Sequence, residues 1–292
     1  MRLALALESR GQNAVVINAD SAQVYADLAI LSARPTAEEM AGIEHRLFGT
    51  WDGAHACSAA DWAEAAKSEI AEAHARDAVP ILVGGTGLYI RTLLDGIAPI
   101  PQIDPEIRKA VRALSVMEAR AALEREDPIR AGHLHASDAA RIARALEVKR
   151  STGRSMAYWQ EQREGGIAAE VSLHPLVLLP DREWLYQRCD RRFTAMMEQG
   201  AIDEVKHLLA RGLAPGLPVM RAIGVPEIAA MLRGEMSREE AIDRGQQATR
   251  NYAKRQYTWF RRQPPADWKR LAQSNCDPVD EVETLFRIFG LT

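Results

Sequence analysis

The amino-acid sequence predicts an α/β protein whose parallel-sheet core is interrupted by a helical insertion. Strand-like apolar runs alternate with helix-like segments in the first part of the chain, at the spacing of crossover connections. This alternation is typical of a parallel sheet with helices on its faces. After Pro101 the strand-like runs stop and helix-like sequence takes their place. We therefore expect an α/β core with C-terminal helices from 1–102 and 170–292, and a helical insertion domain at 103–169.

The first predicted elements follow from local patterns. "RLALALESRG" is typical of a helix that ends at Gly11, and the apolar run at 14–19 predicts a buried strand. "TAEEMAGIEH" predicts a second helix, because Thr36 and Glu39 have the spacing of a capping box. A third helix is expected from about Ser58, and "VPILVGGTGLYI" predicts a strand, a glycine turn and a helix.

The later elements are predicted in the same way. "DPEIRKAVRAL" begins the insertion with an acidic N-cap and a proline at the first helical position. "HPLVLLPD" predicts a buried strand that returns the chain to the core. Long helices are expected at 183–199, 201–211 and 237–262, and in the last of these Ser237 and Glu240 have capping-box spacing.

The composition excludes several classes of protein. With 292 residues, of which 47% are hydrophobic and 26% charged, the chain has an ordinary globular composition. Its three cysteines have no C-x-x-C spacing, which excludes a disulfide framework and a cysteine-rich zinc module and suits the cytoplasm. The apolar runs are far shorter than the roughly 20 residues of a membrane span, and no export signal is found. Because the net charge is −3, any nucleic-acid surface must be a local patch.

A carboxylate and a hydroxyl directly follow the first predicted strand. Asp20 and Ser21 come after the apolar run at 14–19. In open α/β sheets, ligands bind beyond the carboxyl ends of the strands, so Asp20 is a candidate to face a crevice. The alternative is that Asp20 and Ser21 only cap a turn.

A glycine-rich turn follows a later predicted strand. Gly84, Gly85 and Gly87 surround Thr86 at the point where the strand enters a helix. The backbone N–H groups and hydroxyl of such a turn can bind an anion near the helix N-terminus. The alternative is a tight turn whose glycines serve packing. A P-loop of the form G-x-x-x-x-G-K-[ST] occurs nowhere in the chain.

Basic and aromatic residues are interleaved in "RNYAKRQYTWFRR". One face of this predicted helix carries Arg250, Lys254, Tyr257 and Arg261. Such a face suits phosphate contacts and base stacking in RNA. The alternative is an amphipathic helix with Tyr252 and Trp259 in the core and its arginines in solvent. In the insertion, the ordinary alternative is again a solvated helix face, formed by Arg108, Arg112, Arg141 and Arg144.

Eight motifs in a fixed order give the chain a family resemblance. They are "INADSAQVY", "ARPTAEE", "EHRL", "SAADW", "LVGGTGLY", "RALEV", "MRAIG" and "ATRNYAKRQYTWFR". From residue 2 to about 262 the chain resembles the bacterial type of tRNA dimethylallyltransferase, also called tRNA isopentenyltransferase. The resemblance implies a P-loop NTPase-like core. It also implies transfer of a dimethylallyl group from dimethylallyl diphosphate to N6 of the adenine immediately 3′ of the anticodon in tRNA. We expect a cytoplasmic monomer whose partner is the anticodon loop.

The resemblance also implies roles for single residues. Asp20 resembles the general base near N6, Thr86 the hydroxyl at the reacting centre, and Arg221 in "MRAIG" a diphosphate-binding arginine. The loop that holds the flipped base is expected to contain Asp20, Ser21, Ala22 and Gln23. Further tRNA contacts are expected from Arg108, Ala140, Arg141, Ile142, Ala143, Arg144, Arg250 and Lys254.

The family's opening motif "GPTASGKS/T" and the strand before it are absent from this sequence. Counting back from "LALAL" places Met1 where the last Ser or Thr of the motif would stand. The usual phosphate cradle, its Lys and the hydroxyl ligand of Mg²⁺ are therefore missing. Mg²⁺ is the cofactor that the resemblance implies for this nucleotide-binding, ATP-binding type of core, and no other metal ligand is assigned. Either the reading frame has been started too late, or the chain is a truncated homologue.

Two other functions fit parts of the same pattern. A small-molecule kinase of the P-loop class would also have an acid after a strand and a later glycine turn, and it would consume ATP. A non-catalytic tRNA-binding protein would keep the basic helices, bind tRNA with a salt-dependent affinity and transfer no prenyl group.

Overall fold

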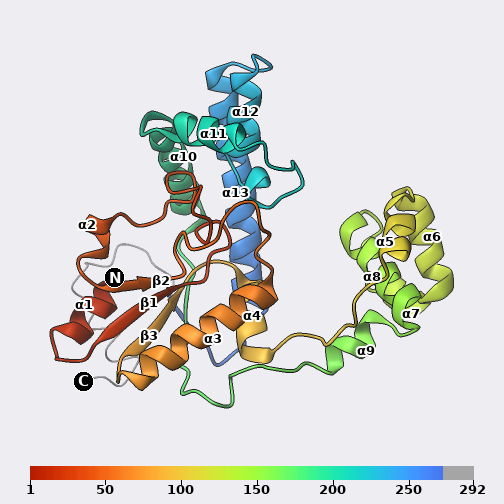
Figure 1. Ribbon diagram of the computed structural model, residues 1–292, viewed down its shortest axis with the longest axis horizontal. Helices are drawn as coiled ribbons and strands as arrows, with labels where there is room; N and C mark the ends of the chain where they lie inside the picture. Colours follow the sequence, from red (N-terminus) through yellow and green to blue (C-terminus); the bar gives the residue numbers. More distant parts are fainter. Residues whose placement is uncertain (272–292) are drawn as a thin grey trace. The chain divides into compact units, whose positions relative to one another are not determined.

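The computed structural model describes residues 1–271 of the chain (Figure 1). The chain forms two compact units. The first consists of Met1–Leu93 together with the described residues from Val171 onward, and the second is Leu94–Glu170.

The first unit contains a three-stranded parallel sheet (Figure 1). Its strands, in the spatial order β2–β1–β3, are β1 (Ala14–Asn18), β2 (Glu44–Arg46) and β3 (Val79–Val83). Val16 of β1 pairs with a residue of β2 on one side and of β3 on the other. All five residues of β1 are buried, as is typical of an inner strand in a parallel sheet. The predicted α/β fold with a parallel sheet is confirmed.

Helices α1 (Arg2–Glu8) and α3 (Ala59–Ala75) pack on this sheet. Leu7 of α1 joins Val16 in one buried cluster, whose packing orders the start of the chain against the sheet. The predicted glycine turn connects β3 to α4 (Gly87–Asp95). Strand, turn and helix therefore follow one another as the sequence predicts.

The second predicted helix is shorter than expected. Thr36 and Glu39 form the predicted capping box, but α2 contains only Ala37–Met40. Ala41 and Gly42 have φ values of +49° and +79°, and this left-handed backbone ends the helix. The prediction that "TAEEMAGIEH" is helical throughout is therefore wrong, because its last residues enter β2.

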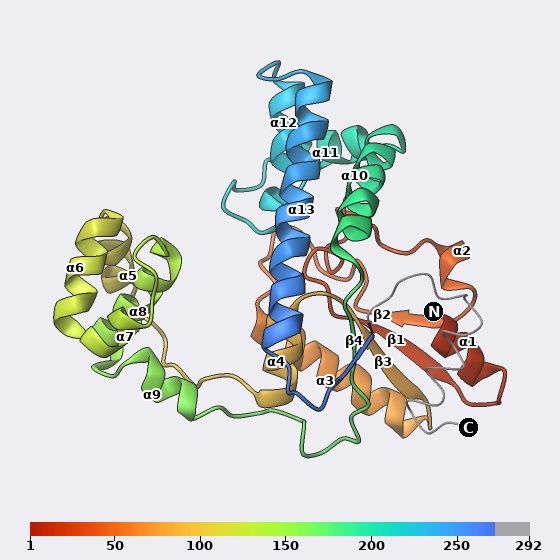
Figure 2. The ribbon, with the colours of Figure 1, turned by 180° about the vertical axis from the view of Figure 1, so that it is seen from behind.

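A group of helices follows the return of the chain to the first unit. In order, they are α10 (Arg182–Glu198), α11 (Ala201–Ala210), the 3₁₀ helix η1 (Val219–Arg221), α12 (Val225–Leu232) and α13 (Arg238–Arg262). The three long predicted helices are confirmed, as is the capping box of Ser237 and Glu240. Helix α13 lies along α10 (Figure 2). None of the helices within residues 1–271 is both long and apolar enough to cross a membrane.

The strand predicted in "HPLVLLPD" forms, but it is less buried than expected. β4 (Leu176–Leu178) pairs in parallel with β5 (Lys269–Leu271), and within the described residues these two strands make a separate sheet. Only Val177 of β4 is buried, whereas Leu178 is 54% exposed. A two-stranded sheet gives each strand only one neighbour, so it covers less side-chain surface than the inner part of a larger sheet.

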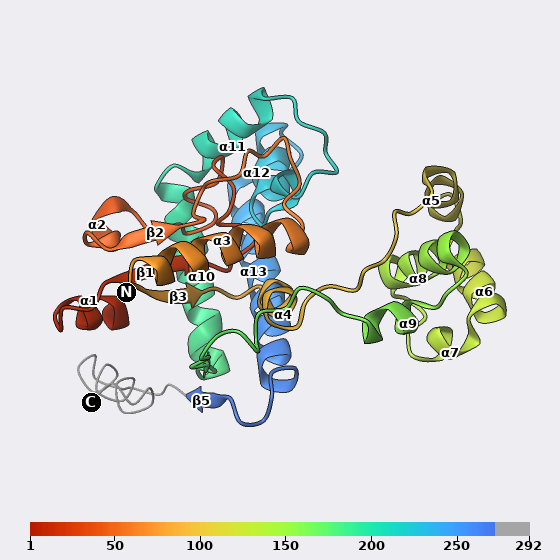
Figure 3. The same cartoon turned by 60° about the horizontal axis from the view of Figure 1, so that its bottom comes forward.

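The second unit is a bundle of short helices (Figure 3). They are α5 (Pro105–Arg112), α6 (Val116–Glu126), α7 (Pro128–Gly132), α8 (Ala139–Thr152) and α9 (Met156–Glu161). The bundle has a core of its own, in which Leu123, Ile142 and Leu146 are fully buried. As predicted, Asp104 caps α5 and a proline occupies its first turn.

The second unit extends beyond the expected insertion because its flanking segments pair with each other. Ile97 and Glu164 exchange two backbone hydrogen bonds of 3.0 Å. The observed unit, Leu94–Glu170, therefore includes the segment before the first helix of the expected range 103–169.

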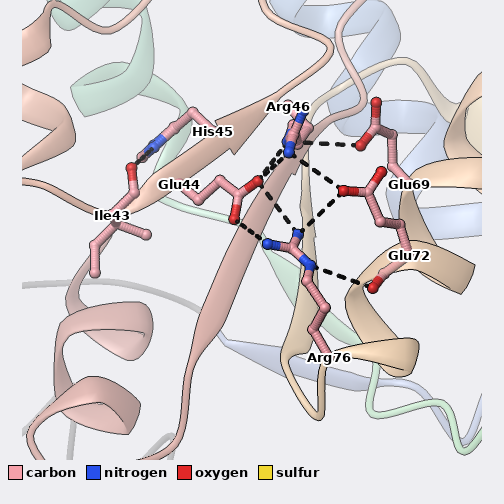
Figure 4. A network of polar contacts seen from close by, with 7 residues as sticks. All are labelled: Ile43, Glu44, His45, Arg46, Glu69, Glu72 and Arg76. Atoms are coloured by element: carbon pink, nitrogen blue, oxygen red, sulfur yellow. Dashed lines mark hydrogen bonds and ion pairs between the residues drawn. The ribbon is translucent and has the colours of Figure 1, made fainter.

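A network of charged side chains joins the edge strand β2 to α3 (Figure 4). Glu44 pairs with Arg46 on its own strand and with Arg76 after α3, the latter at 3.1 Å. Arg46 also lies 3.7 Å from Glu69 and 3.5 Å from Glu72 on α3. Charged side chains on an edge strand discourage pairing with another sheet, so this network protects the open edge of β2.

Candidate active site

Asp20 lies directly beyond β1, in a turn that a buried asparagine holds in place. The Asn18 side chain accepts the N–H of Asp20 at 2.8 Å and donates to the carbonyls of Asp20 and Leu47 at 3.0 Å. The Asp20 carboxylate accepts the N–H of Ala22 at 2.8 Å. Asp20 therefore does cap its turn, as the simpler interpretation predicts, and it also lines a pocket.

Burial raises the pKa of the Asp20 carboxyl above its ordinary value. The backbone N–H groups of Ala22 and Gln23 and the positive charge of Arg192 lower it, but they do not outweigh the loss of solvent. A carboxylate with a raised pKa binds a proton more readily than an exposed one, which suits a general base.

The pocket beside Asp20 has a volume of about 370 Å³ and lies in the first unit. Three arginines from three helices line it: Arg192 of α10, Arg221 of η1 and Arg255 of α13. Among the lining residues that the structure describes, Asp20 is the only acid. This excess of positive charge favours an anionic ligand. Asp20 and Arg221, 201 positions apart in the sequence numbering, therefore share one pocket.

Ser21 and Ala22 line the same pocket, whereas Gln23 does not. The side-chain amide of Gln23 instead donates hydrogen bonds of 3.0 Å to the carbonyls of Ser32 and Ala33. Gln23 therefore ties the loop to the segment that follows it. This placement puts Ser21 and Ala22 in a better position than Gln23 to contact a ligand.

Thr86 of the glycine turn contacts the loop of Asp20. Its hydroxyl oxygen accepts the backbone N–H of Ser21 at 2.9 Å and lies 3.2 Å from the Ser21 hydroxyl. Its own N–H donates to the carbonyl of Ala19 at 3.1 Å. The two separately predicted sites are therefore one structure, but Thr86 reaches the pocket through Ser21 and is not itself a lining residue.

The glycines around Thr86 allow close packing. A Cβ atom on Gly84 would lie 2.2 Å from the backbone of Ala19, and one on Gly87 would lie 2.4 Å from the Trp259 ring. A Cβ on Gly85 would lie 2.1 Å from the side-chain amide of Gln256. Packing therefore accounts for all three glycines, as in the alternative interpretation of this turn.

Tyr252 is a site residue that the sequence pattern did not single out as functional. It lines the pocket, and its hydroxyl interacts with those of Thr86 and Ser21. Burial raises the pKa of Tyr252, and the nearby Asp20 charge raises it further. The Arg255 guanidinium lies 5.6 Å from the centre of the Tyr252 ring.

The face of α13 that meets the site is a different one from the predicted basic face. It carries Tyr252, Arg255, Gln256 and Trp259, at helical spacing i, i+3, i+4 and i+7. Arg250, on the predicted face, instead forms an ion pair of 2.5 Å with Asp190 of α10, and Lys254 is exposed outside the pocket. The residues of both helix faces belong to the motif "ATRNYAKRQYTWFR", so the sequence alone could have indicated the face that meets the site.

The predicted tRNA contacts of the second unit differ in their exposure. Arg108 and Arg144 lie near the carboxylate of Glu147, and Arg141 lies 3.4 Å from Asp138. Ala140 is exposed, Ala143 is partly buried and Ile142 is fully buried. The Ile142 side chain therefore packs in the core of the unit and is not available to a partner in the folded protein.

No cluster of three potential metal-binding side chains is found in the described part of the chain. Within 1–271, no three His, Cys, Asp or Glu side chains gather around a common point. The Thr86 hydroxyl is already bonded to Ser21, and one Asp20 oxygen is bonded to Ala22. Mg²⁺ in phosphate-binding sites usually requires one or two carboxylates together with the phosphates. Among the described residues that line the pocket only Asp20 is a carboxylate, so phosphate groups would have to supply most of the other ligands of a Mg²⁺ ion.

Comparison with known proteins gives one consistent result. The family model described as IPP transferase matches residues 23–263, a range that includes Thr86 and Arg221 and begins just after Ala22. The chain is 68% identical to the tRNA dimethylallyltransferase of Erythrobacter litoralis, over 93% of this chain and 86% of the relative. It is 64% identical to the tRNA dimethylallyltransferase of Novosphingobium aromaticivorans, over 96% of this chain and 99% of the relative.

Solved structures agree with the sequence relatives. The full-length tRNA isopentenylpyrophosphate transferase of Bacillus halodurans is similar with a TM-score of 0.70 and 32% identity, over 99% of this chain and 90% of that protein. A eukaryotic dimethylallyltransferase acting on tRNA is similar with a TM-score of 0.72 and 26% identity, over 88% of this chain and 65% of that protein.

Proposed function

Because this chain belongs to the IPP transferase family, we propose that it transfers a dimethylallyl group from dimethylallyl diphosphate to N6 of the adenine immediately 3′ of the anticodon in tRNA. The resemblance inferred from eight motifs is confirmed, and the relatives are tRNA dimethylallyltransferases. One observation supports both dimethylallyl diphosphate as the prenyl donor and Asp20 as the general base: Asp20 lines the same pocket as three arginines.

The proposed reaction needs a base, because the exocyclic amine of adenine is a weak nucleophile. Its N6 atom forms a bond to the allylic C1 of the donor while the C1–O bond breaks, and the electron pair of that bond leaves with diphosphate. The proton of N6 passes to the Asp20 carboxylate, whose pKa is raised by burial. A positioned general base typically contributes about 10²–10⁴-fold to the rate.

Diphosphate leaves readily only when its negative charge is neutralised. Arg192, Arg221 and Arg255 are the cations that line the pocket, and charge-assisted hydrogen bonds to phosphate are the strongest ones that a protein forms. The apolar part of the lining, which includes Phe193 and Met196, suits the dimethylallyl chain.

Thr86 acts in this proposal as a positioning residue. Its hydroxyl fixes the N–H of Ser21, the residue that follows Asp20, and thereby limits how far the carboxylate can move. A base that is held in place needs less reorganisation during the reaction. Ser21 and Ala22 would contact the extruded base from the same loop.

The tRNA would also contact the second unit, through the exposed arginines Arg108, Arg141 and Arg144. We propose a monomer, since one chain supplies the whole described lining of the pocket, and a cytoplasmic location, where unmodified tRNA is available. The relatives do not favour the two other functions, a small-molecule kinase and a non-catalytic tRNA-binding protein.

The proposed function is tested by incubating the full chain with unmodified tRNA and radiolabelled dimethylallyl diphosphate. We expect label in tRNA, and none when the adenine 3′ of the anticodon is replaced by guanine. Binding of tRNA without any label transfer would support the non-catalytic alternative. ATP hydrolysis without prenyl transfer would support the kinase.

A further inference from the structure

Glu147 is a buried carboxylate at the centre of three arginines in the second unit. It lies on α8 and is 1% exposed. The Nε of Arg112 donates to one of its oxygens at 3.0 Å. The other oxygen lies 3.9 Å from Arg108 and 3.6 Å from Arg144. Two of these arginines come from α5 and one from α8, so the carboxylate joins two helices.

This cluster differs from the other ion pairs described in the unit. Arg150 pairs with Glu126 at 2.7 Å, and Arg120 pairs with Glu124 at 2.6 Å, so each of these two acids forms an ion pair with a single arginine. Around Glu147, three positive charges face one negative charge. The unit as a whole contains as many acidic as basic residues. Any attraction for a polyanion must therefore come from a local excess such as this one.

The arginines are exposed although their partner is not. The exposed fractions of the side chains are 46% for Arg108, 66% for Arg112 and 42% for Arg144. Three guanidinium groups repel one another, and a shared carboxylate counteracts that repulsion. Glu147 therefore holds the three groups close together while most of their donors remain available to a ligand.

Stability alone does not explain a carboxylate at this position. Its neighbours Leu146 and Val148 are fully buried apolar residues, and an apolar side chain at a buried ion cluster is often as stable or more stable. A cluster of net positive charge presented by a buried acid is instead suited to a ligand that carries several negative charges.

We infer that Glu147 is a positioning residue that assembles Arg108, Arg112 and Arg144 into a binding site for the phosphate backbone of tRNA. The inference rests on the proposed function, since tRNA is the polyanion that this family modifies. It adds Arg112 to the predicted contacts and Glu147 as the residue that positions them. It also gives the "RALEV" motif a role: its first residue, Arg144, binds phosphate and its acid, Glu147, sets the geometry.

The test uses Glu147→Gln in the full chain, with Glu126→Gln as the matched control. Both substitutions remove one negative charge from the same unit, and Glu126 has an exposed arginine partner of its own. If net charge alone mattered, both variants would bind tRNA at least as tightly as the wild type. We expect Glu147→Gln to weaken binding roughly three- to tenfold, the effect of one or two lost phosphate contacts, and Glu126→Gln not to weaken it.

The dissociation constant for unmodified tRNA is measured at several salt concentrations, together with steady-state kinetics. Each lost phosphate contact should reduce the slope of log K against log salt by about one. The KM for tRNA should rise in Glu147→Gln, with the KM for dimethylallyl diphosphate unchanged. Glu147→Asp, which keeps the charge, should restore part of the affinity. Equal affinities of Glu147→Gln and Glu126→Gln would overturn the inference.

A second pair of variants covers the case in which Glu147→Gln does not fold. Arg112→Ala removes an exposed arginine of the cluster, and Arg150→Ala removes the arginine that forms an ion pair with Glu126 in the same unit. We expect only Arg112→Ala to reduce affinity and salt slope, and equal effects would contradict the role of the cluster. If the wild type itself does not bind tRNA, the proposed function fails. If the wild type binds tRNA and transfers the dimethylallyl group, but the variants bind tRNA like their controls, only this inference fails.

Discussion

The hydroxyl oxygen of Thr86 accepts the backbone N–H of Ser21 at 2.9 Å. This bond joins the glycine turn after β3 to the loop after β1, and it connects two segments that lie 65 positions apart. Parallel strands bring their carboxyl ends to one edge of the sheet, and here that edge contains Asp20 and the pocket.

Thr86→Val should slow transfer and lower stability, because valine has the shape of threonine but leaves the Ser21 N–H without its acceptor. An unsatisfied donor costs about 1–3 kcal/mol when buried, and this partly exposed one should cost the lower value. The midpoint temperature of thermal unfolding and kcat should both be lower in Thr86→Val than in the wild type, and both should recover in Thr86→Ser. Full turnover by Thr86→Val would show that the bond does not position the base.

Asp20→Asn should reduce kcat by about 10²–10⁴-fold, the usual contribution of a general base, with little change in tRNA affinity. Asparagine keeps the oxygen that caps Ala22, so the turn is retained. Single-turnover transfer and tRNA binding are the measurements. Asp203→Asn is the control, since Asp203 is a 70% exposed partner of Lys206 on α11. Turnover at the wild-type rate would refute the role of Asp20 as base.

The pH dependence of the reaction follows from the raised pKa of Asp20. Transfer requires the unprotonated carboxylate, so the rate should rise with pH through this raised pKa and then level off. Stability should change in the opposite sense, because the folded protein holds this proton at pH values where the unfolded chain has lost it. The contribution of Asp20 to stability therefore declines as pH rises from the unfolded to the folded pKa.

Asp20→Asn separates the two pH effects. It should remove the rising limb of the rate profile, and the thermal stability of this variant relative to the wild type should increase with pH over the same range. A rising limb that persists unchanged in Asp20→Asn would assign the titration to another group.

Arg221→Ala should raise the KM for dimethylallyl diphosphate by roughly 10–100-fold, the effect of losing one hydrogen bond to a charged group. Arg221 lines the pocket with Asp20, whereas the control residue Arg233 lies at the end of α12 and pairs with Glu235. Steady-state kinetics with both variants provide the comparison. Equal KM values for dimethylallyl diphosphate in Arg221→Ala and Arg233→Ala would exclude a contact between Arg221 and this substrate.

The glycine turn predicts losses of stability of different size for two adjacent substitutions. In Gly84→Ala the new Cβ would lie 2.2 Å from the backbone of Ala19, which cannot move without displacing β1. We expect a loss of about 1–3 kcal/mol, typical of overpacking. In Gly85→Ala the neighbour is the flexible side chain of Gln256, so the loss should be smaller. Chemical denaturation of both variants measures the difference.

Several features of the fold could be predicted from the sequence because they depend on neighbouring residues. The buried run of β1, the capping boxes at Thr36 and Ser237, and the proline after Asp104 all act within one or two turns of the chain. Local patterns did not predict burial correctly where it depends on segments that are distant in the sequence. The exposure of Leu178 depends on the few strands that accompany β4, and no pattern within "HPLVLLPD" contains that information.

By itself, the sequence determined the family and the candidate base, because ordered motifs and the end of a strand are properties of the chain alone. Only the tertiary structure decided which cations surround Asp20 and which face of α13 meets the pocket. Arg192 and Arg255 stand in no local motif with Asp20, and Tyr252 and Lys254 belong to one motif but lie on different faces. The physical reason is that charge and burial act through space, so their effect depends on how distant segments pack.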